Sequence, residues 1–343
     1  MPEVSWKDGE VSACIVGGAG FIGSHFTDVL LARAETRRVT LFDNFSSGRE
    51  RHFEQHIGDD RLQVIRGDAA DLDALTMAVA GHHVVIHLAS NPDIARAVTE
   101  PQIDFYHGTL LTHNVVEAMR RAGVARLLYA SGSGVYGERG ETLLKEDSTP
   151  LQPVSTYGAS KLAGEALIAS YCAMFGLAAC AFRFANVVGA RQTHGVGFDF
   201  LRRLRQEPAR LRILGDGRQS KSHVHVQDVV AAVLLANLRV TEGFHVWNVA
   251  TDDAITVTEI AEMAAEILGI HPLPRWDYAG GDRGWKGDVP VVRLDASRIR
   301  ELGWRPRFNS REAVWRSLEE MAEEITIEPL SVLKEMADVR AFS

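Results

Sequence analysis

The sequence is poor in cysteine, in positive charge and in long apolar runs. Its three cysteines, Cys14, Cys172 and Cys180, stand singly, a pattern that indicates neither a disulfide framework nor a zinc site. The thirteen histidines lack the spacing of metal ligands, so we expect no metal. Lysine and arginine total 37 against 45 aspartate and glutamate, and the net charge of -8 argues against a nucleic-acid-binding surface.

Long apolar segments are absent as well. No run approaches the roughly 20 residues that a transmembrane helix needs. The start of the chain, MPEVSWKDGEVSA, lacks the basic and apolar regions of a signal peptide. We therefore expect a cytoplasmic globular protein with no membrane partner. With 46% hydrophobic and 24% charged residues, the chain has enough apolar material for a large core.

Short apolar runs alternate with helix-length stretches in the first half of the chain. These runs read SACIVG, RVTLFD, LQVIRGD, HVVIHLAS, ARLLYAS and LAACAFRF. Such alternation is typical of βαβ units in a parallel sheet with helices on both faces. We predict an α/β protein with a Rossmann-type doubly wound parallel sheet over residues 11–185. Loops and short helices then indicate a smaller C-terminal substrate-binding domain over 186–330. Part of 222–250 is expected to pack with the first domain, residues 11–185.

Residues 13–25, ACIVGGAGFIGSH, have the sequence of a phosphate-binding turn. A predicted strand runs into Gly17, Gly20 and Gly23, and a predicted helix follows. The glycines allow a tight turn, close approach of a pyrophosphate and close packing of helix on strand. Asp43 ends the second strand, twenty residues past Gly23, where a carboxylate accepts ribose hydroxyls and repels a 2′-phosphate. The pattern predicts NAD rather than NADP.

Two further strand ends fit the same dinucleotide. Asp68 follows the third strand, where its carboxylate can meet the adenine amino group. The fourth strand ends in Leu88, Ala89 and Ser90, small enough to let the cofactor pass closely. Together these ends trace the carboxyl edge of a parallel sheet, where such folds bind their ligands.

Tyr157 and Lys161 lie four residues apart at the start of a predicted helix, in STYGASKLAGE. This spacing puts both side chains on one helix face, with the ammonium near the phenol. A neighbouring cation and the helix N-terminus favour phenolate. We therefore expect the pKa of Tyr157 to be lowered, so that it can act as a general base.

These motifs, with several others in the same order, resemble the extended short-chain dehydrogenase/reductase family, in its branch of nucleotide-sugar epimerases and dehydratases. The further segments are DNFSSG, GDAAD, VYG, RFANVVGAR, GDGRQSKSHVHVQD and LGWRP. The resemblance implies a bound NAD, a nucleoside-diphosphate sugar as substrate and a homodimer formed through two helices of the first domain. The cofactor-binding residues it implies, with those derived above, are Gly17, Gly20, Phe21, Ile22, Gly23, Asp43, Asn44, Ser46, Ser47, Gly48, Asp68, Ala69, Leu88, Ala89, Ser90, Tyr157 and Lys161.

The resemblance also implies the chemistry. Tyr157 removes the proton of the sugar 4-hydroxyl while C4 passes hydride to NAD, and Lys161 holds the nicotinamide ribose and tunes Tyr157. The family usually has Ser or Thr four residues before the tyrosine of VYG, a position that is Gly132 here. We assign the role of that hydroxyl to Ser133 first and to Ser131 second.

Departures from the family pattern separate the possible activities. Dehydratases carry an Asp-Glu pair where this chain has Ser133 and Gly134, which disfavours elimination of water. A 4-epimerase of a UDP-sugar, acting through a transient 4-keto intermediate, is therefore the leading hypothesis. The alternatives are a 4,6-dehydratase or related lyase or reductase that uses the same intermediate, and a non-catalytic NAD-binding sensor.

The resemblance places the substrate contacts in the second half of the chain. Asn186 corresponds to a residue that contacts the diphosphate, and Lys221 stands where the family usually has arginine. Trp285 occupies the position of another phosphate-binding arginine, so Arg283 must reach in from further back. A second basic set has two possible roles, contact with the diphosphate or a solvated helix face, of which the solvated face is favoured; it comprises Arg202, Arg203, Arg205, Arg210 and Arg212.

Overall fold

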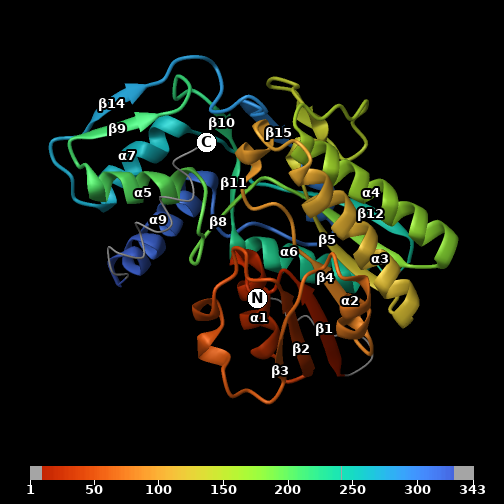
Figure 1. The fold of residues 1–343 in the computed structure, drawn as a ribbon. Helices are drawn as coiled ribbons and strands as arrows, with labels where there is room; N and C mark the ends of the chain where they lie inside the picture. The colour runs from red at the N-terminus through yellow and green to blue at the C-terminus, as the bar shows by residue number, and fades with distance from the viewer. Residues whose placement is uncertain (1–9, 241, 328–343) are drawn as a thin grey trace.

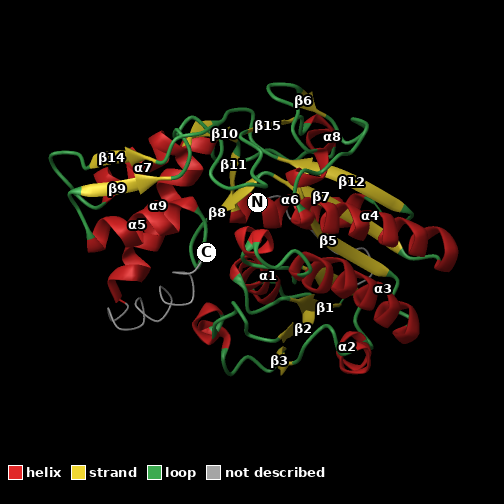
Figure 2. Ribbon diagram, turned by 45° about the horizontal axis from the view of Figure 1, so that its top comes forward, coloured by secondary structure: helices red, strands yellow, loops and turns green. Residues whose placement is uncertain are grey.

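Seven parallel strands form the central sheet of the protein (Figures 1 and 2), in the order β12-β7-β5-β4-β1-β2-β3. The computed structural model describes residues 10–240 and 242–327. The strands of this sheet are β1 (Val11–Val16), β2 (Thr36–Asp43), β3 (Leu62–Arg66), β4 (Val84–His87), β5 (Arg126–Gly132), β7 (Ala178–Phe184) and β12 (Phe244–Val249). All six predicted runs form strands of the sheet, and the predicted α/β Rossmann-type fold is confirmed.

Helices cover both faces of the sheet because successive strand residues point to opposite faces. In β1, Ala13 and Ile15 pack into one core and Cys14 and Val16 into the other. The first core contains α1 (Phe21–Leu31) and α6 (Val226–Arg239). The second contains α2 (Leu72–Val79), α3 (Leu111–Ala122) and α4 (Thr156–Phe175). This double layer leaves the carboxyl ends of the strands open for a ligand.

A second group of elements packs around a core of its own beside the sheet (Figure 1). That core is built from α5 (Val196–Gln206), α7 (Val257–Ile267) and α9 (Ser310–Ile327). The remaining strands and helix are β6 (Leu143–Leu144), β8 (Asn186–Val188), β9 (Arg210–Ile213), β10 (Ser220–Lys221), β11 (His223–His225), β13 (Ile255–Thr256), β14 (Arg275–Tyr278), β15 (Val291–Leu294) and α8 (Ser297–Glu301).

Short helical turns connect these elements, and one of them is π-helical. They are η1 (Glu50–His52), η2 (Glu54–His56), η3 (Ile94–Val98), the π-helical η4 (Phe105–Leu110) and η5 (Ser133–Tyr136). After β8 the chain returns to the sheet through α6 and β12. The domain limits at 185 and 186 stay a prediction, and residues 1–9 and 328–330 lie outside the described residues. Within residues 10–240 and 242–327, none of the helices has the length and apolar character required to cross a membrane.

Candidate active site

A cavity of about 440 Å³ lies at the carboxyl ends of the strands, where β1 and β4 are neighbours and the strand order reverses. Most of the predicted site residues line this dinucleotide cavity. They are Gly17, Gly20, Phe21, Ile22, Gly23, Asp43, Asn44, Ser46, Ser47, Asp68, Ala69, Leu88, Ala89, Ser90, Ser131, Ser133, Tyr157, Lys161, Asn186 and Lys221. Gly48 lies beside it, because a Cβ there would stand 3.1 Å from Asp43 Oδ1.

The glycine turn has no room for side chains. Gly17 has a φ of +85°, and a Cβ there would lie 2.7 Å from the backbone nitrogen of Ala89. A Cβ on Gly23 would lie 2.6 Å from the carbonyl oxygen of Gly17, so only glycine lets α1 pack this closely on the turn. Gly20 precedes α1 and provides no side-chain cap. The first N–H groups of α1 therefore remain available to a pyrophosphate, and the turn fits the diphosphate of NAD.

Asp43 is fixed at the end of β2 by two backbone donors. Its Oδ2 accepts from Ala19 N at 2.9 Å and its Oδ1 from Phe45 N at 2.8 Å. Burial raises the pKa of this carboxyl, against the effect of those two hydrogen bonds. Asn44 Nδ2 donates to Asp68 Oδ2 at 3.2 Å, so the two predicted adenosine-side carboxylates belong to one connected loop region.

Tyr157 and Lys161 lie in the first two turns of α4. Ser155 caps this helix by accepting from Gly158 N at 3.1 Å. Lys161 is 4% exposed, and its Nζ donates to the carbonyl oxygen of Ala130 at 2.8 Å. The same Nζ lies 5.5 Å from the centre of the Tyr157 ring. The helix thus places the phenol and the ammonium side by side at the end of β5.

Burial dominates the acid–base properties of this pair. It raises the pKa of Tyr157 to about 12, where the sequence predicted a lowering by Lys161. Burial likewise lowers the pKa of Lys161 to about 8, although Asp104 opposes that effect. Lys161 therefore holds its proton only weakly, because the same buried environment disfavours both the phenolate and the ammonium.

The rim segment at the end of β5, Ser131–Gly134, places its two serines differently. The Ser131 hydroxyl donates to Glu165 Oε1 at 2.6 Å, inside a buried network. Ser133 begins η5 and lines the cavity. A Cβ on Gly132 would meet nothing within 4 Å, so the missing side chain leaves open space there. Among the described residues, Ser133 has no such buried partner, and we retain it as the candidate for the sugar 4-oxygen.

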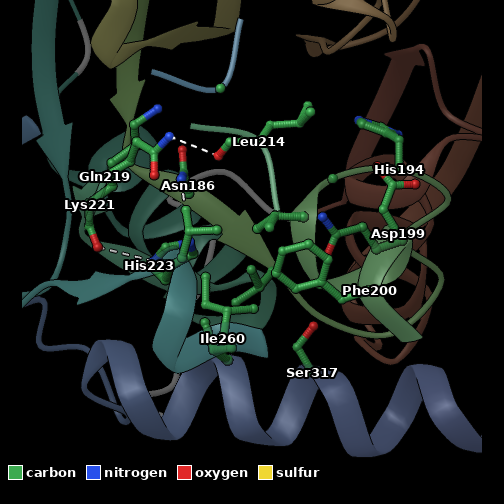
Figure 3. Close-up of a pocket in the computed structure, with 18 of the residues that line it drawn as sticks. Asn186, His194, Asp199, Phe200, Leu214, Gln219, Lys221, His223, Ile260 and Ser317 are labelled. Atoms are coloured by element: carbon green, nitrogen blue, oxygen red, sulfur yellow. Dashed lines mark hydrogen bonds between the residues drawn. The ribbon is translucent and has the colours of Figure 1, made fainter. Parts of the chain in front are cut away.

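A second cavity, of about 460 Å³, lies between the sheet edge and the core of α5, α7 and α9 (Figure 3). Figure 3 shows Asn186 and Lys221 on one side of it and His194 and Asp199 on the other. Its wall is shared with the dinucleotide cavity through Pro92, Ile94, Asn186, Val187, Gln192, His194, Lys221, Trp285 and Asp288. The two cavities are therefore adjacent, with the shared residues between them.

Some of the basic residues line this second cavity, and others lie on other surfaces. Arg203 and Arg212 line it, a role that their place in a basic run did not distinguish from that of a solvated face. Lys221 Nζ lies 2.5 Å from Asp288 Oδ1. Arg283 lines neither cavity and pairs instead with Asp282 and Glu138, so we withdraw it from the substrate contacts. Only the fold distinguishes these positions, because Arg203 of α5 and Arg212 of β9 meet at one cavity although they are distant from Arg283 in the sequence.

The chain is similar to known proteins over nearly its whole length. The model of the NAD dependent epimerase/dehydratase family matches residues 13–250. A UDP-glucose 4-epimerase of Corynebacterium glutamicum is 31% identical over 310 residues, which span 85% of this chain and 90% of the relative. The structure of a Thermotoga maritima UDP-glucose 4-epimerase with UDP-glucose has a TM-score of 0.81 and 30% identity, over 92% of this chain and 99% of that one. A Streptomyces venezuelae dTDP-glucose 4,6-dehydratase with NAD has a TM-score of 0.82 and 26% identity, over 92% and 98%.

Proposed function

The chain belongs to the NAD dependent epimerase/dehydratase family, and from this membership we propose that it interconverts UDP-hexoses that differ in configuration at C4. The protein is an NAD-dependent epimerase that acts on a nucleotide sugar. The observation that carries the proposed reaction is the Tyr157–Lys161 pair in the dinucleotide cavity, beside a rim segment with no carboxylate. UDP is proposed as the nucleotide because the relatives compared above include enzymes named for UDP-glucose.

In the proposed reaction, Tyr157 accepts the proton of the sugar 4-hydroxyl and later returns it. Bound NAD would supply the acceptor and donor of the C4 hydride, and a positive charge beside the phenol. Lys161, fixed by Ala130, holds its charge near Tyr157 and would hold the nicotinamide ribose. Ser133 donates to the 4-oxygen from the opposite rim. The open space at Gly132 gives the sugar room to turn between the two transfers.

A dehydratase is the less favoured activity, although the fold is as similar to that class as to epimerases. Expelling the C6 hydroxyl as water needs a proton donor beside C6. Ser133 and Gly134 offer no carboxylic acid at the rim, and the Asp288 carboxylate of the shared wall is already paired with Lys221. The rim therefore supports hydride return rather than elimination.

The homodimer and the cytoplasmic location also remain proposals. Large apolar side chains are exposed in η4 and at the end of α4, namely Phe105, Tyr106, Met174 and Phe175. Exposed apolar groups on one helical layer support an interface there. The three cysteines are all free, which is usual for proteins of reducing compartments. We propose no nucleic-acid partner, since the chain carries a net charge of -8.

The activity is tested by incubating the NAD-loaded protein with UDP-, dTDP-, GDP- and CDP-hexoses. We expect a product of unchanged mass and inverted C4 from a UDP-hexose, identified by mass spectrometry and by the coupling constants of the sugar protons. Loss of one water would instead identify a dehydratase. No conversion of any sugar, with NAD retained, would favour the sensor.

Substitution of the two cavity arginines is expected to weaken substrate binding. Arg203→Ala or Arg212→Ala removes a cation from the cavity where we place the diphosphate, and each should raise KM for the UDP-sugar about tenfold with little change in kcat. Arg205→Ala is the matched control, because Arg205 lies on the same helix α5 but is exposed and lines neither cavity. Steady-state kinetics measure both constants. An equal rise of KM in Arg205→Ala would assign the effect to overall charge instead.

A further inference from the structure

Ser90 has a hydroxyl in the dinucleotide cavity that the proposed reaction leaves unused. It follows β4 and lines the cavity together with Tyr157 and Lys161. Its Oγ is buried, and within the described part of the chain it has no hydrogen-bond partner of normal geometry. Buried hydroxyls are nearly always paired, so an orphan of this kind in a cavity indicates a partner that it meets in another state of the site.

Asp104 ties the segment that contains Ser90 to the segment that contains Tyr157. Asp104 is 1% exposed and bridges two segments. Its Oδ1 accepts from Asn91 Nδ2 at 2.8 Å, and its Oδ2 accepts from Thr156 Oγ1 at 2.6 Å. Asn91 is the residue after Ser90, and Thr156 is the residue before Tyr157. One buried carboxylate therefore ties together the immediate neighbours of both hydroxyl groups.

The two serines at the end of β5 are placed differently. Ser131 is committed to Glu165, and Gly132 has no side chain. Ser133 lies on the rim, on the turn that follows β5. Ser90 is the serine that affects the phenol, since its hydroxyl lowers the pKa of Tyr157 against the dominant effect of burial. Proximity, burial and the Asp104 bridge all single out Ser90.

We propose that Ser90 is a positioning residue for Tyr157, whose hydroxyl donates a hydrogen bond to the phenolate oxygen when the base is ionised. The proposal rests on the proposed role of Tyr157 as base. In the structure the Ser90 hydroxyl already acts on the phenol, but it does not have a partner at normal hydrogen-bond geometry among the described residues; such contacts are often long in the absence of substrate.

The charge balance at the phenol explains why such a donor is needed. Lys161 faces the ring from α4 and favours phenolate, whereas Asp104 faces it from the segment before η4 and disfavours phenolate. His107 of η4 lines the same cavity. A hydrogen bond donated to an ionised oxygen is among the stronger kinds, and it stabilises the charged form selectively.

The test is a titration of the phenol itself in NAD-loaded protein labelled with [13Cζ]tyrosine, between about pH 6 and pH 10, the range into which the positive charge of bound NAD is expected to bring the midpoint. Tyr157→Phe identifies the resonance of Tyr157. We expect Ser90→Ala to move its midpoint about one unit toward alkaline pH, because the phenolate loses a donor. Ser133→Ala, the matched control, should keep the wild-type midpoint. Ser90→Cys, with a weaker donor, should fall between wild type and Ser90→Ala.

The rising limb of kcat/KM against pH should move with the NMR midpoint in Ser90→Ala, which a merely structural role would not produce. An unchanged midpoint in Ser90→Ala overturns the proposal. An equal displacement in Ser133→Ala, or a wild-type phenol that stays protonated throughout, overturns it as well. Because the titration needs no sugar, a protein that converts no UDP-hexose but shows the Ser90 shift would refute the proposed function and keep this inference.

Discussion

Tyr157→Phe is expected to lower kcat for the UDP-hexose by about a thousandfold or more while the protein keeps its NAD. The phenol is the group that takes the 4-hydroxyl proton, and general acid–base catalysis by one side chain is worth about 10² to 10⁴ in rate. Phenylalanine preserves the ring that packs near Lys161. The cofactor cradle, built from the glycine turn and Asp43, is untouched. The measurements are kcat and the NAD released on denaturation.

Tyr171→Phe is the matched control for this prediction. Tyr171 lies on the same helix α4, but its hydroxyl donates to Glu117 Oε2 at 3.2 Å on the outer side of the helical layer. The same chemical change there should leave kcat within about twofold, since a surface substitution costs little. Full activity of Tyr157→Phe would remove Tyr157 from the mechanism, and loss of NAD from that variant would instead give it a role in cofactor binding.

The parts of the site that could be predicted are those encoded in contiguous sequence. The glycine turn follows β1 and Asp43 ends β2, and both strands are recognisable in the sequence as apolar runs. The parallel sheet then brings the carboxyl ends of these strands together. Tyr157 and Lys161 share a helix, so their spacing alone determines that they are neighbours. Such local patterns need no knowledge of how distant segments pack.

The parts that could not be predicted depend on contacts between distant segments. Ser131 has the residue type of a catalytic hydroxyl. Only the packing of α4 on β5 shows that this hydroxyl donates its hydrogen bond to Glu165 instead. Arg283 has the charge for a diphosphate but is paired with carboxylates outside both cavities. The pKa of Tyr157 depends on burial by the whole fold, which the spacing to Lys161 does not reveal.

The largest expected effect on stability follows from the network that holds Ser131. Arg183 is 3% exposed and Glu165 is 4% exposed. The guanidinium donates to Glu165 through Nε at 3.0 Å and Nη2 at 2.7 Å, and Ser131 donates to the same carboxylate. Arg183→Leu would leave this carboxylate buried without its cation. We expect the free energy of unfolding to fall by about 3–5 kcal/mol, measured by urea denaturation at a fixed NAD concentration.

Two comparisons separate the lost pair from lost packing. Arg120→Leu breaks the exposed pair with Glu117 on α3 and should cost less than about 1 kcal/mol. The double variant Arg183→Leu with Glu165→Leu should be more stable than Arg183→Leu alone, because no uncompensated charge remains. The free energy of unfolding is also measured for Glu165→Leu alone. If the loss in the double variant equals the sum of the losses in Arg183→Leu and Glu165→Leu, packing rather than charge holds the network. Because Glu165 is one turn after Lys161, the same network fixes the register of α4 against β5 and so the place of the phenol at the rim.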